Sequence, residues 1–234
     1  MKKLQYQIKD GLCSIQLDDG RVNAMNLDFF MELHEALDQA EKFRCRAVSF
    51  RGREGLFSAG LDLKYMPTLE SKARARFSQT FARTILRVFT FPIPTVAAVT
   101  GHAIAGGAIL AFACDRRIIL AGNHRVQMNE IKNRMALPNW MSLICATAIP
   151  AHRLTELTLH ARAYNPEEAV AAGLFEATAQ DLNDLDAQVT ACYQDYFEFD
   201  LPSYATTKRW MRSRAAEEAL VHLKDVQAST LFED

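Results

Sequence analysis

The sequence lacks any long apolar run and any excess of one charge. No apolar stretch approaches the ~18 residues that cross a bilayer, so we expect no membrane-spanning helix. Its 27 Lys and Arg balance 28 Asp and Glu, for a formal net charge of −1. No block of like charge gathers either sign, and a chain without a basic patch is a poor candidate for binding nucleic acid or anionic membrane. We therefore expect neither as a partner.

Cysteine pairs are also lacking. The five cysteines form no C-x-x-C motif, and most have apolar neighbours in the sequence. They therefore resemble reduced core residues of an intracellular protein. The histidines form no i, i+4 pair and none pairs with a cysteine at ligand spacing, so no metal site is expected. The start MKKLQYQIKDG has no apolar h-region and the final TLFED is no address signal, so we expect a cytoplasmic location.

What is present predicts an α/β fold. Cys13 to Leu17 alternates apolar and polar residues, as a half-buried strand does, and Asn26 is a typical cap for a helix after it. The runs 47–52 and 96–101 are predicted to be buried strands that end in glycine. We expect a helix over 106–114 and a strand over 116–121. Another helix should start at Asn165, before Pro166, and end near Gly173.

A chain of 234 residues that is 49% hydrophobic can bury a sizeable core. We predict one main domain over residues 1–180. From about Asp181 the pattern changes to helices rich in Ala, Leu and charge, with Pro202 as a break. Residues 181–234 are therefore predicted to be a helical appendage.

Two glycine-containing loops are the first candidates for function. FSAGLDL (57–63) and AIAGG (103–107) each follow a predicted strand and lead toward a helix. Such loops leave backbone N–H groups without acceptors, and two of them converging on one oxygen form an oxyanion hole. Most glycine turns serve only the turn, which is the alternative reading. Neither loop matches a phosphate-binding glycine motif.

Four segments in order resemble the crotonase (enoyl-CoA hydratase/isomerase) superfamily. They are FSAGLDL, then VTGHAIAGGAILAFACDRRI (99–118), MNEI (128–131) and NPEEAVAAGLFEA (165–177). The resemblance covers about residues 5 to 215. It implies a spiral of ββα turns with a C-terminal helical region for trimerisation, a homotrimer or hexamer, and an acyl-CoA thioester substrate. Coenzyme A would belong to the substrate, with no separate cofactor.

The resemblance also assigns site residues. The oxyanion N–H groups would belong to Leu61, after the glycine of the A-G-x-D loop, and to Gly106. Residues lining the CoA and thioester site, mainly through backbone atoms, would be Ala59, Gly60, Asp62 and Leu63. The family commonly continues beyond the equivalent of ASTLFED (228–234) with a helix that helps to cover CoA.

The side chains at the family's two glutamate positions indicate which reaction to expect. Hydratases of the family use two glutamates, and the first position here is Ile109, which cannot transfer a proton. The second is Glu130, preceded by Asn129 where hydratases have proline. The segments VNAMN (22–26), FSAGLDL and LPNW (137–140) resemble the 3,2-enoyl-CoA isomerase branch. One carboxylate suits isomerisation, because it can remove the α proton of a 3-enoyl thioester and return it to the γ carbon. Burial beside Met128 and Ile131 should raise the pKa of Glu130.

Other readings stay open. The same fold could carry a hydratase, a thioester hydrolase or a decarboxylase, or the chain could bind acyl-CoA without turnover. His102 is expected to be a packed residue rather than a base. Lys64 is either a solvated charge or a contact to a CoA phosphate. Residues that could line an acyl pocket, or could equally be plain core, are Phe57, Met66, Phe77, Phe81 and Trp140.

Overall fold

The computed structural model describes residues 2–226, and side chains up to residue 221. The predicted appendage beyond residue 226, including ASTLFED, lies outside the described residues. The strands are β1 (Leu4–Lys9), β2 (Leu12–Leu17), β3 (Ala24–Met25), β4 (Ala47–Arg51), β5 (Gly55–Ser58), β6 (Gly60–Leu61), β7 (Thr95–Val99), β8 (Gly101–Ile104), β9 (Arg116–Leu120), β10 (Val126–Gln127), β11 (Ala163–Tyr164) and β12 (Ala177–Ala179).

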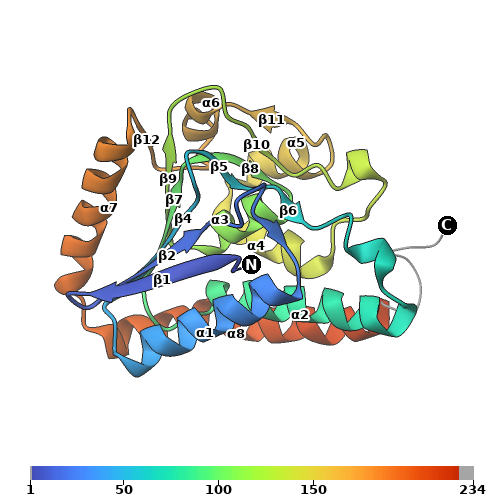
Figure 1. Ribbon diagram of the computed structural model, residues 1–234, viewed down its shortest axis with the longest axis horizontal. Coiled ribbons are helices and arrows are strands. Elements are labelled where there is room, and N and C mark those ends of the chain that lie inside the picture. The colour runs from blue at the N-terminus through green and yellow to red at the C-terminus, as the bar shows by residue number, and fades with distance from the viewer. Residues whose placement is uncertain (1, 227–234) are drawn as a thin grey trace.

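Helices alternate with these strands (Figure 1). The α-helices are α1 (Leu27–Lys42), α2 (Ser71–Phe89), α3 (Gly106–Ala113), α4 (Asn139–Ala148), α5 (Leu154–Thr158), α6 (Pro166–Ala171), α7 (Leu182–Phe197) and α8 (Leu201–Val226). Short 3₁₀ turns are η1 (Met66–Thr68), η2 (Ile131–Asn133) and η3 (Ala151–Arg153).

The strands form three sheets. The largest has the order β1-β2-β4-β7-β9-β12, and only the β1–β2 pair in it is antiparallel. A second sheet has the order β11-β10-β8-β5, and β3 pairs with β6. Successive units share one pattern: β4-β5-α2, β7-β8-α3 and β9-β10-α4 each place their first strand in the large sheet and their second in the smaller one. This repeated pattern is the expected spiral of ββα turns.

Two apolar layers hold the helices against the large sheet. The main core lies between the sheet and the inner helices, with α3 buried along its whole length. A smaller cluster lies between the sheet and α7, which covers the opposite face (Figure 1). Helix α3 is apolar on all sides because it is surrounded by protein, as a fully buried helix requires.

Most of the predicted local elements are confirmed. Asn26 caps α1 by accepting the Phe29 N–H at 3.1 Å, and α6 begins with the full capping box of Asn165 and Glu168. The interpretation of 57–63 and 103–107 as loops was wrong in part, because β6 lies within the first segment and half of β8 lies within the second. Strands of two to four residues are too short for an alternating pattern to be recognised in the sequence.

The C-terminal helices pack back onto the ββα units. The predicted boundary near residue 180 stays a prediction, and there β12 ends at Ala179 and α7 begins at Leu182. Helix α8 contacts α4 and α2. Within residues 2–226 no helix combines the length and the apolarity needed to cross a membrane.

Candidate active site

Strand β6 orients the backbone of the first glycine loop. It pairs with β3 in parallel, with Gly60 opposite Ala24 and Leu61 opposite Met25. The N–H of Asp62 donates to the Met25 carbonyl at 3.0 Å. Because successive N–H groups of a strand point to opposite sides, the N–H of Leu61 is directed away from β3. It therefore faces the start of α3.

The second loop brings Gly106 to the same place. Gly106 is the first residue of α3, so its N–H has no acceptor within the helix. A Cβ on Gly106 would lie 3.3 Å from the Gly60 Cα and 3.5 Å from the Leu61 nitrogen. The backbones that carry the two candidate donors are therefore in contact. The dipole of α3 adds partial positive charge at this end.

Both loops hold unusual backbone conformations at the contact. Gly60 has φ +85°, and a Cβ there would approach the Gly106 nitrogen and the Ile104 carbonyl oxygen to 2.8 Å each. Ala105, which precedes Gly106, has φ 49° although it carries a side chain. Such conformations cost roughly 1–3 kcal/mol and persist where the surrounding structure enforces them. Glycine at position 60 is required on both counts.

Strands β8 and β10 bring Glu130 to the same region as Gly106. They pair in parallel, with Ile104 opposite Gln127, and the Ala105 N–H donates to the Gln127 carbonyl at 2.8 Å. The two strands leave this ladder side by side. The segment after β8 continues into α3, and the segment after β10 continues into Glu130 and η2. The Glu130 carbonyl accepts the N–H groups of Asn133 and Met135, at 2.9 and 3.0 Å, which fixes the turn.

The Glu130 carboxylate is buried without a partner. The residue is 5% exposed, and neither carboxylate oxygen has a hydrogen bond. Desolvation raises its pKa to about 7, which confirms the predicted direction. One expected cause is wrong, because Ile131 is exposed whereas Met128 is buried. Burial and then the Glu130 charge also raise the pKa of the Cys145 thiol to about 12. That thiol therefore stays neutral near the carboxylate.

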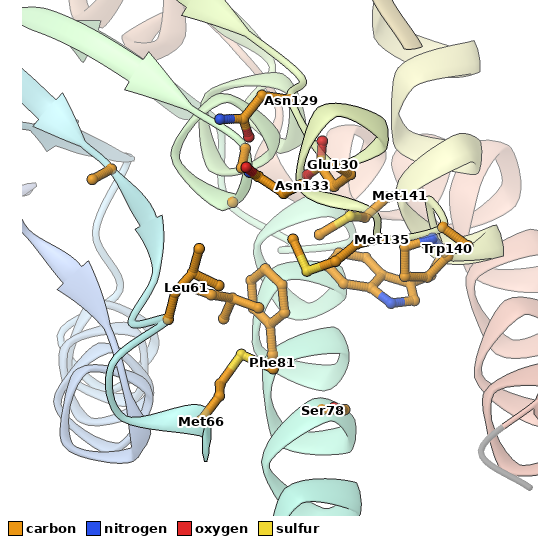
Figure 2. Close-up of a pocket in the computed structure, with 16 residues that line it drawn as sticks. Leu61, Met66, Ser78, Phe81, Asn129, Glu130, Asn133, Met135, Trp140 and Met141 are labelled. Carbon is orange, nitrogen blue, oxygen red and sulfur yellow. The ribbon is translucent and has the colours of Figure 1, made fainter. Parts of the chain in front are cut away.

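One cavity joins these groups (Figure 2). Its walls are mostly apolar, with Phe81 and Trp140 in edge-to-face contact at a centroid distance of 4.9 Å. Glu130 is its one ionisable side chain among the described residues. The lining consists of Ala59, Leu61, Leu63, Met66, Ser78, Phe81, Ala105, Gly106, Asn129, Glu130, Asn133, Met135, Ala136, Pro138, Trp140 and Met141.

The structure brings together most of the residues predicted for the site. Glu130, the oxyanion candidates Leu61 and Gly106, and the substrate-binding candidates Ala59 and Leu63 all line the cavity. Two further candidates lie beside it.

Gly60 packs against Gly106. The Asp62 carboxylate accepts the N–H groups of Lys64 and Tyr65, both at 3.1 Å, and so fixes its own turn. Ile109 is fully buried within α3 and does not line the cavity.

The candidate acyl-pocket residues also fall into two groups, those that line the cavity and those that lie in the core. Met66, Phe81 and Trp140 line the cavity, whereas Phe57 and Phe77 are fully buried in the core.

Away from the cavity, His102 accepts the Arg125 N–H through Nδ1 at 3.0 Å, and its pKa is lowered by burial and nearby positive charge. This placement fits the packed reading. Among residues 2–226 no group of three or more His, Cys, Asp or Glu side chains is placed to hold a metal ion.

Sequence reasoning expected a helix after residues 57–63 without giving its bounds, and it missed much of the far wall of the cavity. Phe77, Phe81 and Ile85 recur at helical spacing within 71–89 and predict an amphipathic helix. Met135 and Met141 flank the LPNW segment, but nothing in the sequence distinguishes a cavity methionine from a core one. The folded geometry is needed for that distinction.

Comparisons with known proteins agree with this architecture. The enoyl-CoA hydratase/isomerase family model matches residues 7–233. Human mitochondrial enoyl-CoA delta isomerase 1 is 30% identical over 226 residues, which cover 92% of this chain and 72% of that protein. A Thermus thermophilus protein with an enoyl-CoA hydratase name is 36% identical over 166 residues, covering 69% of this chain and 65% of that protein.

A solved structure matches almost throughout. The crystal structure of an enoyl-CoA hydratase/isomerase family protein from "Psudomonas syringae" superimposes with a TM-score of 0.91 at 26% identity, covering 98% of each chain. This chain therefore belongs to the enoyl-CoA hydratase/isomerase family of the crotonase superfamily, and it is an enzyme of that family. Relatives carry both hydratase and isomerase names.

Proposed function

We propose that the enzyme moves the double bond of a 3-enoyl-CoA to the 2-position. One observation carries the proposal: Glu130 is the one ionisable side chain among the described residues that line the cavity, and Ile109 stands buried where a second acid would be. Moving a double bond needs one group that takes and returns a proton, whereas adding water is better served by two.

The proposed mechanism has two proton transfers. The Glu130 carboxylate removes a proton from C2 of the thioester, and the C–H electron pair moves toward the carbonyl to give a dienolate. The N–H groups of Leu61 and Gly106 bind the resulting oxyanion, each contributing roughly 3 kcal/mol to transition-state stabilisation. The Glu130 carboxyl then returns the proton to C4. The double bond now lies between C2 and C3, and no atom is gained or lost.

Burial matches Glu130 to this task. A base with an unshifted pKa near 4.5 would be too weak to take a carbon-bound proton efficiently. A pKa near 7 keeps about half the molecules ionised at neutral pH and makes each carboxylate more basic. The apolar walls also limit the access of water, which would otherwise solvate the dienolate.

The remaining assignments belong to the same proposal. The segment Ala59, Gly60, Asp62 and Leu63 would hold the thioester end of CoA mainly through backbone atoms, with no cofactor apart from the CoA of the substrate. We also propose a homotrimer or hexamer and a cytoplasmic location. Human and rat relatives are named as mitochondrial proteins and an Arabidopsis thaliana relative as a peroxisomal one, so the compartment differs among relatives.

The competing activities lead to different products. A hydratase adds water to a 2-enoyl-CoA, and the name of the Thermus thermophilus relative favours this second candidate. A hydrolase releases free CoA, a decarboxylase releases carbon dioxide, and a binding protein turns over nothing. The primary test incubates the purified enzyme with 3-enoyl-CoA substrates of several chain lengths and follows the absorbance of the conjugated thioester.

We expect conjugated product from the wild type and none from Glu130→Gln, with binding of a saturated acyl-CoA nearly unchanged. The kcat/KM should rise with pH and level off above about 7, because only the carboxylate form of Glu130 is active. Release of free CoA without conjugated product, or equal behaviour of the two proteins, would reject the isomerase proposal.

A further inference from the structure

The side chain of Asn129 brings to the cavity an amide whose oxygen makes no hydrogen bond. Asn129 lines the cavity, and its Oδ1 is buried with no hydrogen-bond partner. A buried amide oxygen without a partner costs about 1–3 kcal/mol, so its position calls for a ligand or a function. No role in the mechanism above uses this side chain.

The strand register sets Asn129 beside the oxyanion site. Ala103 and Ile104 of β8 lie opposite Val126 and Gln127 of β10. The Ala105 N–H continues the ladder by donating to the Gln127 carbonyl. Gly106 lies two residues after the end of β8, and Asn129 lies two residues after the end of β10. Both residues line the cavity. Figure 2 shows Asn129 next to Glu130 on the same segment of chain.

The amide does not act on Glu130 in this structure. Both Glu130 oxygens lack any hydrogen bond, so Asn129 donates to neither. The raised pKa of Glu130 comes from desolvation, with only a backbone hydrogen bond opposing it. The described residues therefore supply no partner for Oδ1, which leaves a ligand in the cavity as the candidate.

The chemistry of an acyl thioester selects one end of the amide. The acyl portion of the thioester has no hydrogen-bond donor. Its one strong acceptor is the carbonyl oxygen, which becomes an anion in the dienolate. A half-turn about the Cβ–Cγ bond exchanges Oδ1 and Nδ2, and it breaks no hydrogen bond to Oδ1. It would place an N–H donor where the unsatisfied oxygen now lies.

We propose that Asn129 is a third oxyanion donor, whose Nδ2–H binds the thioester oxygen together with the N–H groups of Leu61 and Gly106. This rests on the proposed enolate chemistry at the same site. The donor strengthens its hydrogen bond as charge develops on the oxygen, so it acts on the transition state more than on bound substrate. Asn129 is then a catalytic residue.

Two substitutions test the donor. Asn129→Leu keeps the size and removes the amide, and Asn129→Asp keeps the shape but offers only acceptors. We expect kcat on 3-enoyl-CoA to fall by about 100-fold in Asn129→Leu and further in Asn129→Asp, with KM changed less than threefold. Asn183→Leu is the matched control, because Asn183 is exposed on α7 and does not line the cavity.

The pH profile separates a donor from a positioning residue. In Asn129→Leu the acidic limb should keep its midpoint, because the substitution does not act through Glu130. A wild-type kcat in Asn129→Leu overturns the proposal. So does a kcat loss accompanied by a shifted midpoint, and so does an equal loss in Asn183→Leu. If Asn129→Leu does not fold, the uncharged variant Asn129→Ala takes its place under the same criteria, because the added charge of Asn129→Asp would itself shift the midpoint.

A second measurement does not depend on the isomerase activity. Butanoyl-CoA has no double bond to move, but an enzyme that stabilises its enolate exchanges the α protons for deuterium in D₂O, as mass spectrometry detects. We expect exchange by the wild type and about 100-fold slower exchange by Asn129→Leu. Exchange without isomerisation rejects only the proposed function. Isomerisation or exchange that is insensitive to Asn129 rejects only the third donor, and no exchange together with no isomerisation rejects both.

Discussion

At the scale of single residues, the buried carboxylate of Glu130 lowers the free energy of unfolding. Its carboxylate is buried without a hydrogen bond, which raises its pKa to about 7 from the ordinary 4.5. Below pH 4.5 the group is neutral in both the folded and the unfolded chain. As the pH rises toward 7, the unfolded chain releases this proton first, so the free energy of unfolding falls. The full cost is present above pH 7.

Replacing the carboxylate should therefore stabilise the protein at high pH. We expect Glu130→Gln to raise the free energy of unfolding by about 2–3 kcal/mol at pH 8 and to change it little at pH 4.5. Urea unfolding at the two pH values measures the difference. Glu35→Gln on the exposed side of α1 is the control and should behave alike at both. A pH-independent effect of Glu130→Gln would contradict the burial cost.

Individual functional residues were partly predictable. The motif around Glu130 predicted the residue that we propose as the base, and the absence of an acid at Ile109 favoured the proposed reaction. The proposed role of Asn129 was not predictable, because an amide becomes significant only when a buried atom lacks a partner. The separation of Phe81, at the cavity, from Phe77, in the core, likewise depends on which face of α2 each occupies.

At the scale of elements, the contact between β6 and the start of α3 sets the geometry of the proposed oxyanion hole. Its closeness depends on Gly60, which needs both its positive φ and its missing side chain. Because the Leu61 N–H follows Gly60 directly, any movement of β6 changes the distance between the two donors. A displacement of about 1 Å can cost about 100-fold in rate.

We expect Gly60→Ala to lower kcat by about 100-fold and to destabilise the fold by about 1–3 kcal/mol. Gly20→Ala is the matched control, since Gly20 also has positive φ (+71°) but nothing lies within 4 Å of the added Cβ. It should lose about 1 kcal/mol of stability and keep wild-type kcat. Steady-state kinetics and thermal unfolding measure both. Comparable kcat losses in the two variants would mean that backbone strain, rather than close approach, explains the effect.

The longer elements were predictable because periodicity and caps agree with the fold. The capped start of α1 and the buried strands β4 and β7 follow directly from residue patterns. Strands β3, β6 and β10 have two residues each, too few for any period, and form because their neighbours already hold the chain there.

At the scale of the whole molecule, one buried carboxylate fastens α8 to the ββα units. Asp115, between α3 and β9, accepts hydrogen bonds from Lys208 at 2.6 Å and Arg212 at 2.8 Å. It also accepts the N–H and the hydroxyl of Thr95, both at 2.9 Å. The two cations hold the pKa of Asp115 below its ordinary value despite its burial. The sequence indicated only that Asp115 ends a helix, because its partners lie about 90 residues further along.

Removing this carboxylate should release α8. Asp115→Asn leaves the Lys208 ammonium, 5% exposed, without a counter-charge, so we expect a loss of about 3–5 kcal/mol in the free energy of unfolding. Arg214→Ala breaks an exposed pair with Glu218 on the same helix and should cost less than about 1 kcal/mol.

The double variant Asp115→Asn, Lys208→Met removes the unpaired charge as well. It should recover about half of the loss caused by Asp115→Asn, because an apolar side chain can occupy the buried position without a desolvation penalty. Chemical unfolding of the wild type, Asp115→Asn, Lys208→Met and the double variant gives the coupling between the two residues. If Asp115→Asn costs no more than Arg214→Ala, or if Lys208→Met adds its own loss in full, then apolar packing alone holds α8 in place.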